Sequence, residues 1–208
     1  MKLNNPKVSH CIDKNIMEVF KEDDYNNYNF YGNVDDEILI KDVTFDSCIF
    51  NKIDFTNIKL QNVDLVDCIF EDCDLSNKEF DNKLIGRVIF KNCKMLGLSF
   101  VTSSLKDVVF DNCVLRYVNF SNSKLNNILF KESNLEEASF LEVEVKNIEF
   151  DKCDLTKTEI IKTNLKDVDL STSNISSALF DLYSLKGIII DRFQSASLVG
   201  MLGVKIKN

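Results

Sequence analysis

The chain has 208 residues, of which 45% are apolar, and this is enough to form one domain with a continuous core. Its 33 acidic and 25 basic residues give a formal charge of −8, which disfavours binding to the phosphate backbone of nucleic acids. No apolar stretch approaches the roughly 20 residues of a membrane span, and the N-terminal sequence lacks the apolar core of a signal peptide. We therefore expect a cytoplasmic protein that binds neither nucleic acid nor membranes directly.

Residues 1–37 are acidic and do not follow the pattern of the rest of the chain. We predict that they form an N-terminal cap, with a capping helix from Ile12 to Glu22. The only histidine, His10, lies in this segment, and we expect it to be a solvated residue.

A five-residue period begins at Ile40 and continues to Ile190, and every fifth residue in this range is large and apolar. With about four apolar residues in ten, a run of thirty-one such positions has a random probability on the order of one in a trillion. A period of five matches neither a helix nor a simple strand. The pattern therefore predicts a solenoid over residues 38–192, in which each repeat turns a corner.

Two further positions of the repeat support this interpretation. Two residues before each large centre, the chain usually carries a small or β-branched apolar residue such as Val63 or Cys93, which points to the same side of a strand as the centre. Two residues after the centre, Asn and Asp are frequent, as at Asn77 and Asn122, and these residues tolerate turn conformations. Each repeat is thus predicted to be a short extended side followed by a bend.

Units such as Cys73 to Asn77, Val118 to Asn122 and Cys153 to Lys157 resemble the A-[D/N]-L-x-x unit of the pentapeptide-repeat family. The resemblance covers about three quarters of the chain. It implies an all-β fold, a right-handed quadrilateral β-helix with four repeats in each coil. Thirty-one repeats would then make nearly eight coils and a rod roughly 37 Å long.

A four-sided coil stacks residues that are twenty apart. Phe occupies every multiple of ten from 80 to 150, so phenylalanines should form columns on two opposite sides. The same rule places Cys73, Cys93, Cys113 and Cys153 in one inward column, interrupted by Ser133. Such a column permits metal or redox chemistry, but inward cysteines alternating with Ala, Val and Ser favour core packing. The sequence accordingly predicts no cofactor, no metal and no disulfide framework.

Two features of the repeat region depart from a uniform rod. Lys78 and Lys83 occupy two neighbouring inward positions, so we expect a local bulge or outward-turned side chains there. An apolar ladder of outward residues runs along one side, and it either stabilises the sheet or binds a partner. The apolar ladder consists of Ile49, Ile69, Ile89, Val109 and Leu129.

Residues 193–208 are predicted to form a short C-terminal helix and strand. Asp191 is a candidate N-cap, Gly203 a candidate helix stop, and Val204 to Lys207 a short strand. This end resembles the dimerisation module of the Qnr and MfpA group of pentapeptide-repeat proteins. The resemblance implies a homodimer with contacts from Phe193, Leu198, Met201, Leu202 and Val204.

No catalytic pattern accompanies the repeats. A P-loop, a G-x-G-x-x-G motif and an H-E-x-x-H motif are all lacking, and the single histidine has no nucleophile nearby in sequence. The sequence thus favours a binding protein over an enzyme.

Within the family, the uninterrupted repeats resemble loop-free members of the Qnr and MfpA group, which protect type II topoisomerases. This resemblance implies an acidic rod that imitates DNA, binds DNA gyrase or topoisomerase IV, and lowers fluoroquinolone sensitivity. A generic scaffold for some other protein is the alternative. The candidate partner-binding surface consists of Glu71, Asp72, Asp111, Glu136, Glu137 and Asp154.

Charge density bears on the DNA-mimic hypothesis. Duplex DNA has about one charge per 1.7 Å, or about 22 over a rod of this length, whereas residues 38–190 carry a net charge of −6. Any mimicry must therefore depend on shape and on local acidic patches.

Overall fold

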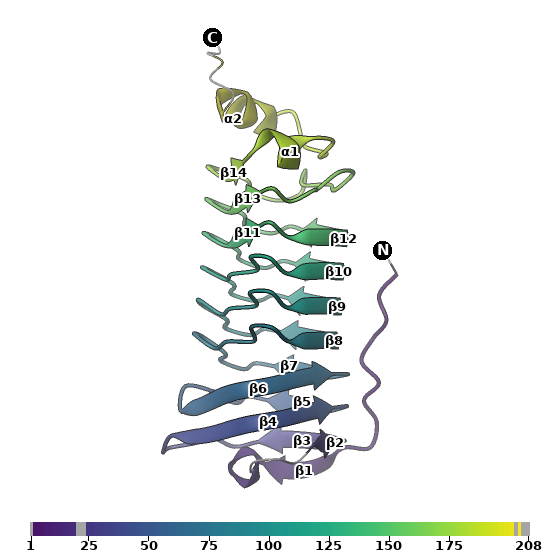
Figure 1. Cartoon of the computed structure of the whole chain (residues 1–208), viewed down its shortest axis with the longest axis vertical. Coiled ribbons are helices and arrows are strands. Elements are labelled where there is room, and N and C mark those ends of the chain that lie inside the picture. The colour runs from purple at the N-terminus through teal and green to yellow at the C-terminus, as the bar shows by residue number, and fades with distance from the viewer. Residues whose placement is uncertain (1, 20–23, 202–203, 205–208) are drawn as a thin grey trace.

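Parallel strands stacked one above another form a rod in the computed structural model, which describes residues 2–19, 24–201 and 204 (Figure 1). In these residues the strands of the lower half are β1 (Ile12–Asn15), β2 (Tyr25–Asn26), β3 (Tyr28–Tyr31), β4 (Ile38–Asp46), β5 (Ile49–Asn51), β6 (Ile58–Val66) and β7 (Ile69–Glu71). Those of the upper half are β8 (Leu84–Lys91), β9 (Ser104–Asp111), β10 (Lys124–Lys131), β11 (Ser139–Leu141), β12 (Glu144–Asp151), β13 (Glu159–Ile161) and β14 (Leu179–Phe180). A 3-10 turn, η1 (Ile16–Glu18), follows β1, and two helices, α1 (Leu182–Leu185) and α2 (Gln194–Met201), lie at the upper end.

The pairing register between coils is constant. Residues that face each other in neighbouring strands are twenty apart, from Ile38 opposite Ile58 to Asp169 opposite Ile189. One coil therefore contains four five-residue sides, and no insertion interrupts the rod between these residues. The predicted four-sided parallel β-helix of about eight coils is confirmed.

The corners of the coil have a left-handed backbone conformation. Positive φ angles near 55° recur at five-residue intervals, at Asn77, Asn82 and Asn92 as predicted from their residue type. The same conformation occurs at Tyr117 and Lys157, whose side chains do not favour it. The geometry of the tube thus imposes the corner, and Asn or Asp reduces its strain. Asn57 is an exception among the predicted turn residues, because it is not among those with positive φ.

The large centre of nearly every repeat lies inside the tube. Of the thirty-one predicted centres, 26 are buried, and the other five are partly buried against the same core. The phenylalanines form two columns, as predicted: Phe90, Phe110 and Phe130 stack with ring centroids 5.2 and 4.9 Å apart. Rings of the two columns meet edge to face across the tube, as Phe110 and Phe120 do at 6.1 Å. Stacked aromatic rings therefore fill a large part of the interior up to Phe150.

The inward cysteines belong to this core, and they are free thiols. Each thiol donates a hydrogen bond to a carbonyl oxygen of the preceding coil, for example from Cys113 Sγ to Phe90 O at 3.3 Å. Ser133 occupies the same column and donates to Phe110 O at 3.1 Å. Burial raises the pKa of Cys48 and of Cys153 to about 11. The prediction of core packing for this column is confirmed.

The N-terminal segment differs from the prediction. The expected capping helix from Ile12 to Glu22 is wrong for the described residues, because β1 pairs with β3 and only the short turn η1 follows it. Tyr25 and Phe30 enter the aromatic stack, with ring centroids 5.8 Å apart. Burial of these side chains favours strands over the helix that the sequence pattern predicts. The stack of paired strands therefore begins before residue 38. Residues 20–22 lie outside the described residues.

Lys78 and Lys83 coincide with a break in the ladder. In the described structure β6 pairs with β8 only at Leu65 and Val66, so residues 77–83, which include the two lysines, do not pair with the coil below. The same coil stays paired on its other sides, as at Asp54 opposite Asp74. The ammonium groups turn to the coil below and hydrogen-bond Thr56 O, at 3.3 Å, and Asn62 Oδ1. Of the two predicted outcomes, outward-turned side chains are observed without a bulge, because an unpaired ammonium group cannot be buried.

The upper end combines one predicted and one unpredicted helix. Asp191 Oδ1 accepts hydrogen bonds from the amides of Phe193 and Gln194 at 2.6 and 2.8 Å. The predicted short C-terminal helix is confirmed, but α2 begins at Gln194, so Phe193 precedes the helix that was predicted to include it. The single turn α1 was not predicted, and it replaces a side of the last coil. Asp181 Oδ1 caps it by accepting from Ser184 N at 2.8 Å. No helix in the described ranges is long and apolar enough to cross a membrane.

We expect substitution of Phe110 by Ala to lower the free energy of unfolding by about 3–5 kcal/mol, because it opens a cavity in the middle of the stack. Urea unfolding followed by circular dichroism measures the change. Leu84→Ala is the matched control, since Leu84 is 68% exposed and its loss should change stability by less than about 0.5 kcal/mol. Equal effects of the two substitutions would contradict the inward placement of Phe110.

The buried thiols predict a loss of stability at alkaline pH. A thiol of the unfolded chain ionises near pH 8.5, whereas Cys153 stays protonated in the folded chain up to about pH 11. The contribution of Cys153 to the free energy of unfolding is complete below pH 8.5 and is lost as the pH rises towards 11. At pH 10 the loss is about 2 kcal/mol. Cys153→Ser should reduce this decline in urea unfolding measured from pH 7 to 10, while Tyr and Lys ionise equally in both proteins. An unchanged decline would show that Cys153 is not buried.

Candidate partner-binding surfaces

The six carboxylates of the predicted partner-binding surface lie along one side of the rod. With a register of twenty, Glu71 and Asp111 share a column at one corner, and Asp72 is the next residue on the chain. Asp154 lies on the adjoining flat side, and Glu136 and Glu137 occupy its far corner. The coil thus brings together residues up to 83 positions apart, and we call this the acidic side.

Most carboxylates of the acidic side are paired with a cation of a neighbouring coil. Lys91 Nζ lies 2.7 Å from Glu71 Oε1, and Lys131 Nζ lies 3.1 Å from Asp111 Oδ1. Continuing upward, Asp151 follows Lys131 in the same column, so the signs alternate. The column is therefore a ladder of alternating charge rather than a continuous acidic strip.

The far corner repeats this arrangement. Arg116 Nε lies 3.0 Å from Glu136 Oε2, and Lys157 Nζ lies 3.2 Å from Glu137 Oε1. Asp72 and Asp154 instead accept hydrogen bonds from Asn side chains of the next coil, at 3.1 and 3.2 Å. Exposed ion pairs of this kind contribute only about 0–1 kcal/mol each, so a partner's cations can replace them at small cost.

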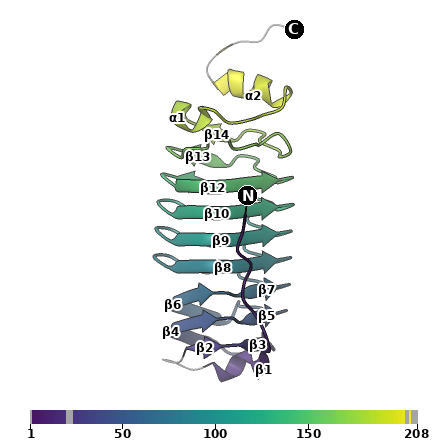
Figure 2. The same ribbon diagram turned by 90° about the vertical axis from the view of Figure 1, so that its right-hand side faces the viewer.

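The apolar ladder lies on a different side and is half-buried. Its five side chains face each other in register, from Ile49 opposite Ile69 to Val109 opposite Leu129. Figure 2 shows residues 2–11 running upward along the side that carries β5, β7 and β8. Within this segment Leu3, Pro6 and Val8 are half-buried. The chain's own N-terminal segment therefore lies along this side.

Buried carboxylates anchor the N-terminal segment at the adjacent corner. Lys7 N donates to Asp67 Oδ1 at 2.9 Å, and Asn4 Nδ2 donates to Asp107 Oδ2 at 2.9 Å. Asp67 also forms two hydrogen bonds with Arg87, at 2.7 and 2.6 Å, and these bonds lower the pKa of its carboxyl group. The sequence analysis missed this attachment, since the contacts join residues 60 and 103 positions apart.

The C-terminal end exposes large apolar side chains. Phe193 is 74% exposed, with the Arg192 guanidinium 4.6 Å from its ring centroid, and Val204 is also exposed. Leu198 is buried in the chain's own core, so it fixes α2 to the rod. The Met201 side chain, Leu202 and the rest of the predicted strand lie outside what the structure describes. We call the exposed apolar residues at this end of the rod the end patch. It consists of Phe193 and Val204 and of three residues that the sequence analysis missed, Leu182, Tyr183 and Ile189.

The described residues include no group of three or more His, Cys, Asp or Glu side chains placed to hold a metal ion. His10 is exposed on the N-terminal segment. The prominent features are surfaces: the acidic side, the apolar ladder and the end patch.

A stacked five-residue repeat of this kind defines the class of repeat solenoids with a parallel β-helical fold. Family models for the pentapeptide repeat region and for pentapeptide repeats match residues 63–140, and residues 40–77 and 133–172, respectively. These matches span residues 40–172, more than half of the chain. The chain belongs to the pentapeptide-repeat family.

Several solved structures of pentapeptide-repeat proteins are similar to this chain at low sequence identity. Full-length QnrB1, a plasmid-mediated fluoroquinolone resistance protein, is 20% identical with a TM-score of 0.51, over 93% of this chain and 98% of QnrB1. A pentapeptide repeat protein of the Arabidopsis thaliana thylakoid lumen is 24% identical with a TM-score of 0.34, over 48% of this chain and 66% of its own. HetL of the cyanobacterium Nostoc sp., involved in heterocyst differentiation regulation, is 14% identical with a TM-score of 0.32, over 89% and 92%. No curated protein sequence matches significantly.

Proposed function

We propose that this chain is a non-catalytic rod that binds a type II topoisomerase, DNA gyrase or topoisomerase IV, and protects it from fluoroquinolones. The observation that carries the proposal is the uninterrupted rod, whose fold is shared with QnrB1 along almost the full length of both chains. The acidic side supports it, because a topoisomerase binds DNA through basic residues. Such a partner implies a cytoplasmic location.

The ion pairs of the acidic side suggest how binding proceeds. Each pair joins two coils through exposed side chains, and its Lys or Arg can turn to solvent when a partner's cation approaches. Because the rod carries far fewer net charges than DNA of the same length, the complex would depend on the width and straightness of the rod. Local electrostatics would mainly orient the encounter.

A scaffold for a different protein is the second candidate. Most carboxylates of the acidic side form ion pairs with Lys or Arg, and this favours the scaffold. A DNA-binding surface would be attracted only weakly to a column of alternating charge. The half-buried apolar ladder offers a contact surface that does not require charge.

A supercoiling assay distinguishes the two candidates. We expect the purified protein to restore DNA gyrase activity in the presence of ciprofloxacin. Glu136→Gln combined with Glu137→Gln should weaken this protection about tenfold, because the acidic side loses two carboxylates. Glu144→Gln is the matched control: this carboxylate also pairs with a lysine at 3.2 Å, but on another side.

Protection that is absent over a wide concentration range, for both gyrase and topoisomerase IV, would reject the topoisomerase proposal. A pull-down that enriches a different protein and lacks topoisomerase subunits would then favour the scaffold.

We also propose that two chains form a symmetric dimer through the end patch and the C-terminal residues Phe193, Met201, Leu202 and Val204. Leu198, which was also predicted to contact the second chain, is left out because it is buried in the chain's own core. Phe193→Glu should convert the dimer to a monomer in sedimentation velocity, because it places a charge in an apolar contact, and it should leave the fold intact since Phe193 is exposed. Leu84→Glu, at an exposed position on the side of the rod, should leave the dimer unchanged. A monomeric parent protein at micromolar concentration would refute the dimer.

A further inference from the structure

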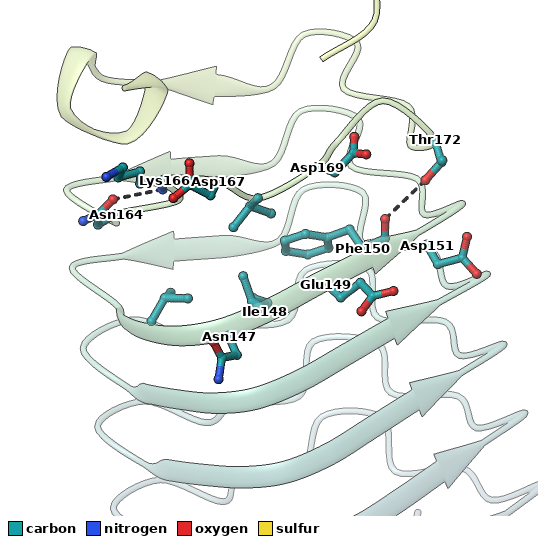
Figure 3. Close-up of a pocket in the computed structure, with 12 residues that line it drawn as sticks. Asn147, Ile148, Glu149, Phe150, Asp151, Asn164, Lys166, Asp167, Asp169 and Thr172 are labelled. Carbon is teal, nitrogen blue, oxygen red and sulfur yellow. Dashed lines mark hydrogen bonds between the residues drawn. The ribbon is translucent and has the colours of Figure 1, made fainter. Parts of the chain in front are cut away.

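Two breaks in the pairing between coils divide the rod into sections. At the first break, residues 77–83 do not pair with the coil below, and a cavity of about 290 Å³ lies beside Leu60 and Lys78. At the second break, no strand in the described structure pairs with the upper edge of β12, and a cavity of about 690 Å³ lies there. Figure 3 shows the second break, where Thr172 Oγ1 donates a hydrogen bond to Phe150 O at 3.3 Å.

The breaks weaken the rod because a solenoid is stabilised between neighbouring coils. Each coil contacts only the coils above and below it, so a weak interface allows one section to unfold without the other. We call residues 38–67 the lower section, residues 84–151 the middle section and residues 159–190 the upper section. Sections that unfold together must therefore be connected by contacts that cross a break.

The N-terminal segment crosses the first break along one corner of the coil (Figure 2). In the lower section, Cys11 Sγ donates a hydrogen bond to Ser47 O at 3.5 Å. In the middle section, Asn4 Nδ2 donates to Asp107 Oδ2 at 2.9 Å. Ser47 and Asp107 occupy the same corner column, three coils apart at the register of twenty residues. The segment therefore joins coils that are not neighbours.

Asp67 lies between these two contacts and joins three parts of the molecule. Its Oδ1 accepts a hydrogen bond from Lys7 N at 2.9 Å, and its two oxygens accept from Arg87, one coil higher, at 2.7 and 2.6 Å. The side chain is only 5% exposed, and hydrogen bonds to a carboxylate that is shielded from water are stronger than exposed ones. Asp67 thus ties the N-terminal segment to both edges of the first break.

Asp107 has the same arrangement two coils higher. It is buried, and Asn4 Nδ2 from the segment and Asn127 Nδ2 from the next coil each donate to it at 2.9 Å. Three residues of extended chain, as from Asn4 to Lys7, span about 10 Å, and two coil spacings from Asp67 to Asp107 are also about 10 Å. The segment must therefore be extended between these anchors. Because an extended segment cannot lengthen, separating the two sections would break one of its hydrogen bonds.

We propose that residues 2–11 act as a strap that couples the lower and middle sections across the first break, so that the two sections unfold as one unit. The strap supplies contacts between coils that are not neighbours, which the repeat itself does not provide. Its anchor Asp107 lies below β12, and so below the second break. The upper section should therefore behave independently of the strap.

Native-state hydrogen–deuterium exchange, measured by mass spectrometry at neutral pH, tests the strap. In the parent chain we expect the buried strand amides of the lower and middle sections to exchange at similar rates, through a shared opening. Asn4→Ala combined with Lys7→Pro removes the side-chain donor to Asp107 and the backbone donor to Asp67. The lower section should then exchange at least about tenfold faster than the middle section. The upper section should keep the rate that it has in the parent.

Asn5→Ala combined with Ser9→Pro is the matched control, because it makes the same kinds of change at exposed positions of the strap. Its exchange should match that of the parent in all three sections. Far-ultraviolet circular dichroism checks that each variant is folded.

Four results would overturn the proposal. They are a lower section that already exchanges much faster than the middle section in the parent, equal exchange of the two sections in the Asn4→Ala, Lys7→Pro variant, the same effect in the control variant, and loss of the whole fold. Loss of the whole fold would show that the segment supports the entire rod rather than one interface.

Discussion

The inward stacking of one large apolar side chain every five residues is the constraint on which this structure depends. The interior of the tube has room for one layer of such side chains per coil, and rings in consecutive coils stack about 5 Å apart, which matches the spacing of paired strands. Register, corner conformation and rod shape all follow from this match. A shift by one residue would expose the entire core, so the register is strongly determined.

Backbone pairing between neighbouring coils is not uniform along the rod. The core is apolar along the whole rod, yet the pairing fails at two places. At one, Lys78 and Lys83 replace apolar residues, and their ammonium groups must reach solvent and carbonyl oxygens. At the other, above β12, the inward residues Ile148, Leu165 and Val168 are apolar and buried, yet no strand pairs with this edge of β12 in the described structure. Core packing and backbone pairing are therefore separable in a solenoid, because each coil is held by its neighbours on four sides independently.

A rod of this kind acts through its surfaces, and the three that it presents differ in chemistry. The acidic side has exposed carboxylates whose ion pairs are weak enough to be exchanged. The side with the apolar ladder carries the N-terminal segment, anchored by Asp67 and Asp107. The upper end exposes Phe193 and its neighbours. A protein partner on the acidic side and a second copy at the end patch would not compete for the same residues.

The sequence by itself determined the solenoid, the four-sided coil, the phenylalanine and cysteine columns and the helix capped by Asp191. These features repeat or depend on neighbours in sequence, so their signal is local. Only the tertiary structure decided the path of residues 2–19, where burial of aromatic side chains prevailed over a helical pattern, and the single turn α1. It also decided which carboxylates form ion pairs and where the pairing between coils stops, because these depend on contacts between residues twenty positions apart. The attachment of the N-terminal segment likewise depends on contacts between residues up to 103 positions apart.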